Sequence, residues 1–265
     1  MKINQKIVFF DIDGTIYSFR KGMPKDTKEA IKQLKKNGHI PVICTGRTRS
    51  MIYPEHLAPG FEHIIAGAGT YVEIEGKQTH LVEMEQKEAK KLIQKFIEYG
   101  FFPVAEGRDA LYLGTDATKL GSDNKEVVRI YQEKIGTRVL TVNHPDLRVS
   151  KVSALFTHDS DKEGMIQSVE KDYTVVDHNG NLLELIPKGT SKVKGIEIMI
   201  EQLDIPRENT YAFGDSFNDI DMLQYVQYGC AMGNSEEAIK KQTPFVTDDY
   251  DKGGIMNGLK KFGLI

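Results

Sequence analysis

Short apolar runs alternate with a longer amphipathic segment near the N-terminus of this chain. The apolar runs occupy residues 6–10, 41–44 and 63–66, and residues 26–37 carry apolar side chains at helical spacing. Strands that alternate with helices form parallel sheets with helices packed on their faces. The order of these segments therefore predicts an α/β fold with a mainly parallel sheet.

The same order returns near the C-terminus. Strands are predicted at 210–213 and 228–232, with a short helix at 220–223 between them. A polar stretch can also begin a helix at Thr48. Ser191 can cap a further helix, whose apolar residues recur at helical spacing: Val193, Ile196, Ile200 and Leu203.

The middle of the chain has an αβ alternation of its own. Helical patterns and apolar runs follow one another between residues 83 and 186. The helices are expected at 86–99, 122–134 and 162–171, and the strands at 111–113, 151–156, 173–176 and 182–186. Because the flanking parts complete one another, we predict one core domain from 1–82 and 187–265, with 83–186 as a smaller inserted α/β domain.

Composition excludes several classes of protein. The net charge of −3 argues against a nucleic-acid platform, and no GxxxxGK[ST] motif supports a P-loop enzyme. Cys44 and Cys230 lie far apart and outside any CxxC motif, which favours free thiols in a reducing compartment. No apolar stretch approaches the roughly 18 residues of a membrane span. We expect a cytoplasmic protein, a monomer or small homo-oligomer, that binds neither nucleic acid nor membrane.

Two carboxylates, Asp11 and Asp13, end the first apolar run, and Gly14 then permits a sharp turn. Such a pair at the end of a strand can hold Mg²⁺ through oxygen. One carboxylate can also attack phosphorus while the other serves as acid and base. A solvated acidic turn would have the same short pattern, so this motif alone does not decide.

Thr45, Gly46 and Arg47 follow the second apolar run. A hydroxyl and open backbone amides at a strand-to-helix turn can cradle phosphate, although an ordinary helix cap explains them equally well. Lys192 stands at the start of the Ser191 helix, where a positive charge opposes the helix dipole. A role in binding phosphate would explain that placement, whereas the neighbouring Lys188 and Lys194 are expected to be solvated lysines.

Asp215 follows the strand at 210–213 as Asp11 follows the first one, and it can supply another oxygen ligand. Asn218 and Asp219 come on the first turn of the next helix, where they can orient the lysine and the metal ligands. An acidic helix cap is the alternative. Because each motif follows a predicted strand or begins a helix, we expect the motifs to meet at one edge of the sheet.

The chain resembles the haloacid dehalogenase-like superfamily, and in particular its Cof-type branch of sugar-phosphate phosphatases. The resemblance covers essentially the whole chain and rests on the strings FFDIDGT, ICTGR, KGTSKVKGI, AFGDSFNDIDML and CAMGNS. It implies a Rossmann-like core with an inserted α/β cap of the C2B type that sets substrate specificity. One departure is Ala68, which stands where relatives often carry asparagine.

The resemblance also implies roles for the motif residues. Asp11 would become an aspartyl-phosphate, and Asp13 would protonate the leaving oxygen and then activate water. Thr45, Gly46 and Lys192 would bind phosphate, with Arg47 in support.

The metal site implied by the resemblance holds Mg²⁺. Its ligands would be the Asp11 carboxylate, the Asp13 backbone carbonyl and Asp215, supported by Asn218 and Asp219. A phosphosugar mutase would use the same aspartate, and a phosphometabolite sensor or a dehalogenase remains a weaker alternative.

Specificity is expected to come from the inserted domain. His178, in a polar turn at 177–180, and Glu184 could touch a sugar hydroxyl of the substrate. A plain hairpin turn is the competing interpretation of this segment.

Overall fold

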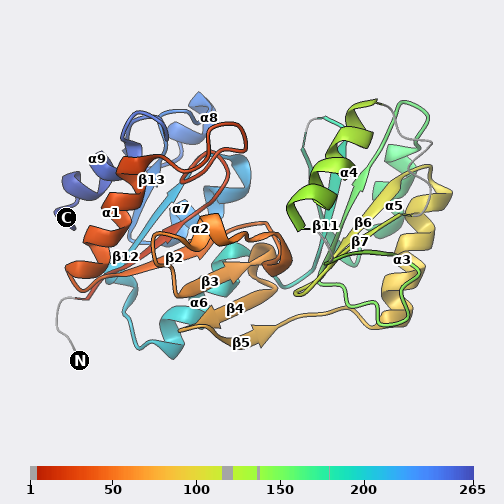
Figure 1. Ribbon diagram of the computed structural model, residues 1–265, viewed down its shortest axis with the longest axis horizontal. Coiled ribbons are helices and arrows are strands. Elements are labelled where there is room, and N and C mark those ends of the chain that lie inside the picture. Colours follow the sequence, from red (N-terminus) through yellow and green to blue (C-terminus); the bar gives the residue numbers. More distant parts are fainter. Residues whose placement is uncertain (1–4, 115–121, 136–137, 179) are drawn as a thin grey trace. The chain divides into compact units, whose positions relative to one another are not determined.

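The computed structural model describes residues 5–114, 122–135, 138–178 and 180–265, and the chain forms two compact units (Figure 1). The first unit contains the described residues up to Gly46 together with Pro54–His80 and Ser191–Ile265. The second unit contains Arg47–Tyr53 and Leu81–Thr190. The predicted inserted segment, 83–186, falls inside the second unit. The second unit also contains residues 47–53, which lie within the core domain predicted from the sequence.

The first unit is built on an eight-stranded sheet with the order β14-β13-β12-β1-β2-β3-β4-β5. The six strands from β14 to β3 are parallel, and β4 runs antiparallel to β3. This confirms the predicted, mainly parallel α/β sheet. The strands are β1 (Ile7–Phe10), β2 (Ile40–Cys44), β3 (His63–Ala66), β4 (Tyr71–Ile74), β5 (Lys77–Leu81), β12 (Thr210–Gly214), β13 (Tyr228–Ala231) and β14 (Phe245–Val246).

Helices cover both faces of this sheet. Helices α6 (Lys192–Gln202) and α7 (Ile220–Tyr225) pack on the face that contains Phe9, and α1 (Lys25–Lys36) and α9 (Gly254–Lys261) pack on the other. The close approach of α9 depends on Gly258, because a β-carbon there would lie 2.4 Å from the ring of Phe213. Two short helices, α2 (Pro54–Leu57) and α8 (Glu237–Lys240), lie in the loops.

The strand order decides where the motifs meet. β12, β1 and β2 are neighbours and run in the same direction, so their carboxyl ends share one edge of the sheet. Asp215, Asp11 and Thr45 are the residues that follow these three strands. The fold therefore brings together residues that are about 200 positions apart, as in the pair Thr15 and Asp215.

The second unit is a six-stranded sheet with the order β10-β11-β9-β6-β7-β8. Its pairs are antiparallel except β7 with β8. Helices α3 and α5 pack on one face and α4 on the other (Figure 1). The elements are α3 (Gln86–Glu98), β6 (Phe102–Glu106), β7 (Leu111–Leu113), α4 (Ser122–Ile135), β8 (Val139–Thr141), β9 (Lys151–Leu155), α5 (Lys162–Val169), β10 (Tyr173–Asp177) and β11 (Leu182–Pro187).

Two local features differ from expectation. The helix that can begin at Thr48 is only one turn of 3₁₀ helix, Arg49–Met51, which Thr48 precedes. No strand was predicted at 102–106, where β6 lies, and Pro103 within it lacks the amide hydrogen that a central strand normally uses. Asn179 of the predicted 177–180 turn lies outside the described residues. No helix in the described part of the chain is long and apolar enough to span a membrane.

Candidate active site

Asp11 lies buried at the carboxyl end of β1. Its backbone amide donates to the carbonyl of Phe213 (3.1 Å), and the residue is only 5% exposed. Lys192 Nζ donates to Asp11 Oδ1 at 2.8 Å. Burial raises the pKa of Asp11 to about 7, the charge of Lys192 opposes this rise, and Asp219 and Asp13 add to it.

Lys192 is the first residue of α6, and Ser191 caps that helix by accepting a hydrogen bond from the amide of Lys194. Its ammonium group also lies 2.5 Å from Asp219 Oδ1. Burial alone would lower the pKa of Lys192, but the two carboxylates raise it above the ordinary lysine value. The predicted phosphate lysine is thus a buried, permanent positive charge at the sheet edge.

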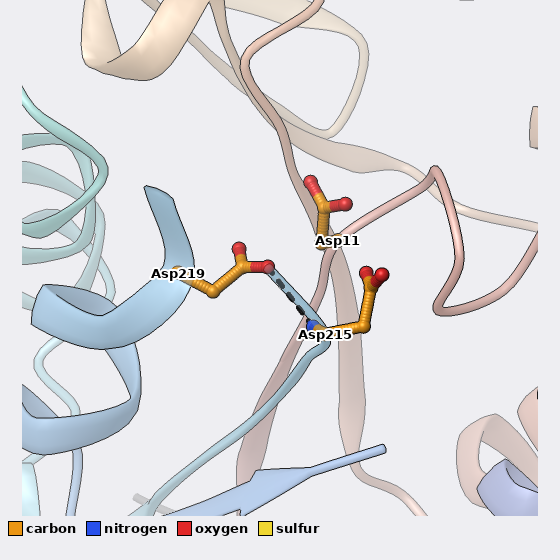
Figure 2. Close-up of side chains that lie close together, drawn as sticks. All are labelled: Asp11, Asp215 and Asp219. Atoms are coloured by element: carbon orange, nitrogen blue, oxygen red, sulfur yellow. Dashed lines mark hydrogen bonds between the residues drawn. The ribbon is translucent and has the colours of Figure 1, made fainter. Parts of the chain in front are cut away.

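Asp219 is fully buried and serves as an anchor. Its Oδ2 accepts hydrogen bonds from the amides of Asp215 (3.0 Å) and Ser216 (3.1 Å), the first of which Figure 2 shows. Because Oδ1 is bonded to Lys192, both oxygens of Asp219 are engaged. This side chain orients the lysine and the turn that carries Asp215.

Asp215 lies beside Asp11, and its Oδ1 accepts a hydrogen bond from Thr15 at 2.9 Å. Burial, with the charges of Asp11 and Asp219, raises the pKa of Asp215 to about 8. Gly14 has a left-handed backbone (φ 77°), and a β-carbon there would lie 2.2 Å from Asp215 Oδ2. Glycine is therefore required for Asp215 to approach this loop.

The side chains of Asp11, Asp215 and Asp219 converge (Figure 2). One carboxylate oxygen from each lies within 4.8 Å of the others, the spacing of a metal site. Asp219 already uses both oxygens, whereas Asp11 and Asp215 each have one that accepts no hydrogen bond from the described residues. Such hard oxygen donors suit a divalent cation such as Mg²⁺.

The predicted phosphate loop, Thr45 and Gly46, follows β2. Thr45 is 1% exposed, and its amide donates to Ile65 O (2.9 Å) while its carbonyl accepts from the amide of Ala68 (3.0 Å). A β-carbon on Gly46 would lie 3.8 Å from Asn218 Nδ2, so Asn218 is a close neighbour. The sheet edge thus gathers these residues with Asp11, as the sequence predicted.

Asp13 and Arg47 were also predicted to belong to this site. Asp13 is exposed on the loop after Asp11, and its charge adds to the rise in the pKa of Asp11. Arg47 belongs to the second unit, where its guanidinium lies 5.4 Å above the ring of Tyr53.

His178 and Glu184 form a separate pair in the second unit, with 3.0 Å between Nε2 and Oε2. Glu184 Oε1 also lies 2.8 Å from the ammonium of Lys151. Glu184 is buried, whereas the side chain of His178 is 34% exposed. Of the two, only His178 offers a substantial accessible surface to a ligand.

Sequence reasoning missed two supporting residues. Thr15 orients Asp215, and Asn234 Nδ2 donates to the carbonyl of Gly14 at 2.9 Å. Asn234 Oδ1 in turn accepts from the amide of Tyr250. Both residues lie inside strings that supported the resemblance, FFDIDGT and CAMGNS, but no local pattern assigned either of them a partner.

Comparison with known proteins agrees with this geometry. Residues 8–259 match the family of haloacid dehalogenase-like hydrolases. YkrA of Bacillus subtilis is 29% identical over 99% of this chain and all of its own length. A 5-amino-6-(5-phospho-D-ribitylamino)uracil phosphatase of Bacillus subtilis, YitU, is 25% identical over 99% of each chain.

A solved structure is also similar over nearly the full length. The subclass IIB sugar phosphatase BT4131 superposes with a TM-score of 0.83 and 25% identity, over 98% of this chain and all of that one. The chain therefore belongs to the haloacid dehalogenase-like hydrolases and is an enzyme of their phosphatase class. This confirms the predicted family and class of enzyme.

Proposed function

We propose that this enzyme is a Mg²⁺-dependent phosphatase of small phosphorylated metabolites, and of sugar phosphates in particular, that acts through an aspartyl-phosphate on Asp11. The buried contact between Asp11 and Lys192 carries this proposal. It combines a nucleophile with a fixed cation that can neutralise phosphoryl oxygens. The names of two relatives, a sugar phosphatase and a phosphoribitylamino-uracil phosphatase, support a polyhydroxylated substrate.

In the first step, a carboxylate oxygen of Asp11 forms a bond to phosphorus, and the bond between phosphorus and the leaving oxygen breaks. Lys192 donates to Oδ1, which fixes the orientation of the carboxylate for this attack. Asp13 donates its proton to the departing alkoxide, which leaves as an alcohol. Thr45 and Gly46 hold the phosphoryl oxygens during this transfer.

In the second step, Asp13 removes a proton from water, and that water attacks phosphorus. The bond to Asp11 breaks, which releases inorganic phosphate and restores the carboxylate. Two displacements replace one difficult reaction. Mg²⁺ would supply charge stabilisation to the phosphoryl oxygens, held by Asp11, the Asp13 carbonyl and Asp215, with Asn218 and Asp219 in support.

For substrate selection, we propose that the second unit acts as the cap. His178 would contact a substrate hydroxyl, while its hydrogen bond with Glu184 fixes the orientation of the imidazole. The alanine variant His178→Ala should change the order of kcat/KM values across a panel of phosphosugars. Unchanged values for every member of the panel would remove His178 from the site.

The central experiment measures phosphate release from a metabolite panel with and without Mg²⁺. Asp11→Asn should lower kcat by on the order of a thousandfold or more with the fold intact, because the amide is no nucleophile. Asp221→Asn, an exposed aspartate on α7, is the matched control and should keep full activity. Normal turnover in Asp11→Asn would refute the mechanism.

The products distinguish the remaining alternatives. Isomerised sugar phosphate in place of free phosphate would identify a phosphosugar mutase. Binding without hydrolysis of any ester in Mg²⁺ would identify a sensor. We also propose a cytoplasmic enzyme, supported by two buried free thiols, Cys44 and Cys230, and a monomer or small homo-oligomer that binds neither nucleic acid nor membrane.

A further inference from the structure

A buried ionic cluster crosses three neighbouring strands of the second unit. Glu106 on β6, Lys151 on β9 and Glu184 on β11 are only 3%, 3% and 8% exposed. Lys151 Nζ lies 2.8 Å from Glu184 Oε1 and 3.6 Å from Glu106 Oε2. Glu106 and Lys151 are directly opposed in the sheet, so the cluster is built into the strand register.

Stability alone does not explain these charges. Moving charged groups out of water costs free energy that an ion pair often fails to recover, and apolar side chains of similar volume commonly stabilise a protein as well. The same sheet face shows this alternative, because Val104 and Leu155 pack there against apolar side chains. The burial of these charged groups therefore needs an explanation other than stability, and the contacts of Glu106 suggest one.

Glu106 fastens the segment Arg47–Tyr53 to the sheet. Its Oε2 accepts a hydrogen bond from the Thr48 hydroxyl at 3.1 Å, while its Oε1 accepts one from the Ser153 hydroxyl. Thr48 is 2% exposed. Nearby, the fully buried Ser50 hydroxyl donates to the carbonyl of Gly107 at 2.8 Å. These hydrogen bonds thus hold the first half of the segment on the second unit.

The second half of the segment is held by apolar contacts. Met51 and Tyr53 are 9% and 5% exposed and pack in one cluster with Phe102, Val104 and Leu155 of the sheet. In addition, Arg138 donates to the carbonyl of Ser50 at 3.0 Å. The segment is consequently part of the core of the second unit, although its first residue directly follows Gly46 of the first unit.

The short covalent connection between the two units limits the conformations of the phosphate loop. Thr45 is held in the first unit by backbone bonds to Ile65 and Ala68, and Thr48 is held in the second unit by Glu106. Only Gly46 and Arg47 separate the two anchored residues. Three residue steps span at most about 11 Å, so the second anchor restricts the conformations that the loop can adopt.

We propose that Glu106 is a positioning residue for the phosphate loop: through Thr48 it fixes the backbone after Gly46 and so strengthens the binding of phosphate. The second unit then contributes to phosphate affinity as well as to substrate choice. This inference rests on the proposed role of Thr45 and Gly46 in phosphate binding.

The test compares the dissociation constant of inorganic phosphate in the full-length protein with Mg²⁺, measured by calorimetry. Thr48→Val removes the hydroxyl at nearly constant volume and should raise this constant about fivefold. Thr48→Ser restores the hydroxyl and should stay within about twofold of the wild type. Ser153→Ala removes a hydrogen bond from the same carboxylate without touching the segment, so it is the matched control and should also stay within about twofold.

A double-variant cycle identifies Glu106 as the partner. Glu106→Met keeps an unbranched side chain of similar length but removes the acceptor oxygens, so it should weaken phosphate binding, and adding Thr48→Val to it should cause no further loss, because both act through one hydrogen bond. An unchanged dissociation constant in Thr48→Val, or an equal rise in Ser153→Ala, would overturn the inference.

The two proposals fail in different ways. A wild type that binds phosphate but hydrolyses no ester would refute the phosphatase alone. An active wild type whose Thr48→Val variant binds phosphate equally well would refute only the positioning role.

Discussion

Lys192 is the most informative single side chain to remove. Its ammonium group is the only cation in direct contact with the buried carboxylates of Asp11 and Asp219 among the described residues, at 2.8 and 2.5 Å. The substitution Lys192→Met keeps an unbranched side chain of similar length but leaves two buried charges without their partner. Breaking a buried ion pair in this way costs about 3–5 kcal/mol of unfolding free energy.

The loss should depend on pH, with a defined sign. Burial raises the pKa of Asp11 to about 7 even though Lys192 opposes it, so removing the lysine raises this pKa further. A carboxyl group whose pKa is higher in the folded state contributes stability below its unfolded pKa, and that contribution is lost as the pH rises through the folded pKa. The destabilisation should therefore be greatest at about pH 8 and shrink towards about pH 5.

Urea unfolding in EDTA measures both effects. The chain has no tryptophan, so far-ultraviolet circular dichroism is the suitable signal. Lys194→Met is the matched control, because Lys194 lies on the same helix with a side chain that is 54% exposed and pairs with Glu197. Loss of that exposed pair should cost less than about 1 kcal/mol at any pH.

Two results would refute this reasoning. A loss below about 1 kcal/mol for Lys192→Met at about pH 8 would mean that the lysine does not compensate buried carboxylates. A full loss that stays constant down to about pH 5 would mean that Asp11 does not titrate in this range.

Three further predictions follow from the first unit. Ala68 has a left-handed backbone (φ 52°), so Ala68→Gly should increase the unfolding free energy by about 1 kcal/mol, and a decrease would contradict this strain. Burial lowers the pKa of His63, so the stability that its neutral form contributes above its ordinary pKa of 6.5 is lost as the pH falls. The variant His63→Leu should therefore lose less stability at acid pH than the wild type. The control His158→Gln, at a side chain that is 90% exposed, should lose as much as the wild type. EDTA should abolish hydrolysis and Mg²⁺ should restore it, and Mg²⁺ should raise the melting temperature unless Asp215 is replaced by asparagine.

The sheet and its reactive edge could be predicted because their signals are local. An apolar run ends, and the next residue is Asp11, Thr45 or Asp215. The pattern could not predict the strand order, because no residue near position 210 indicates that β12 pairs with β1. That pairing is a long-range choice, and it places the first and last motifs side by side.

The missed features depend on tertiary contacts. Pro103 suggests that no central strand is present, yet β6 pairs on both sides in the second unit. Thr48 looks like a helix cap, but its hydroxyl is bonded to Glu106, which lies 58 residues further along the chain. In both cases the local preference is outweighed by contacts that no sequence window contains.

The charges around Asp11 connect these observations. Among the residues that the structure describes, Lys192 supplies the one buried ammonium beside Asp11, Asp215 and Asp219, and burial raises the pKa of Asp11 to about 7 and that of Asp215 to about 8. A protonated Asp11 cannot attack phosphorus, so the proposed nucleophile needs more positive charge than the lysine supplies. A divalent cation on the two oxygens that accept no hydrogen bond would lower both pKa values, because opposite charge favours the ionised form. The same cation would then activate the nucleophile and attract the phosphate, which is why metal removal and Lys192→Met should impair the enzyme through one electrostatic cause.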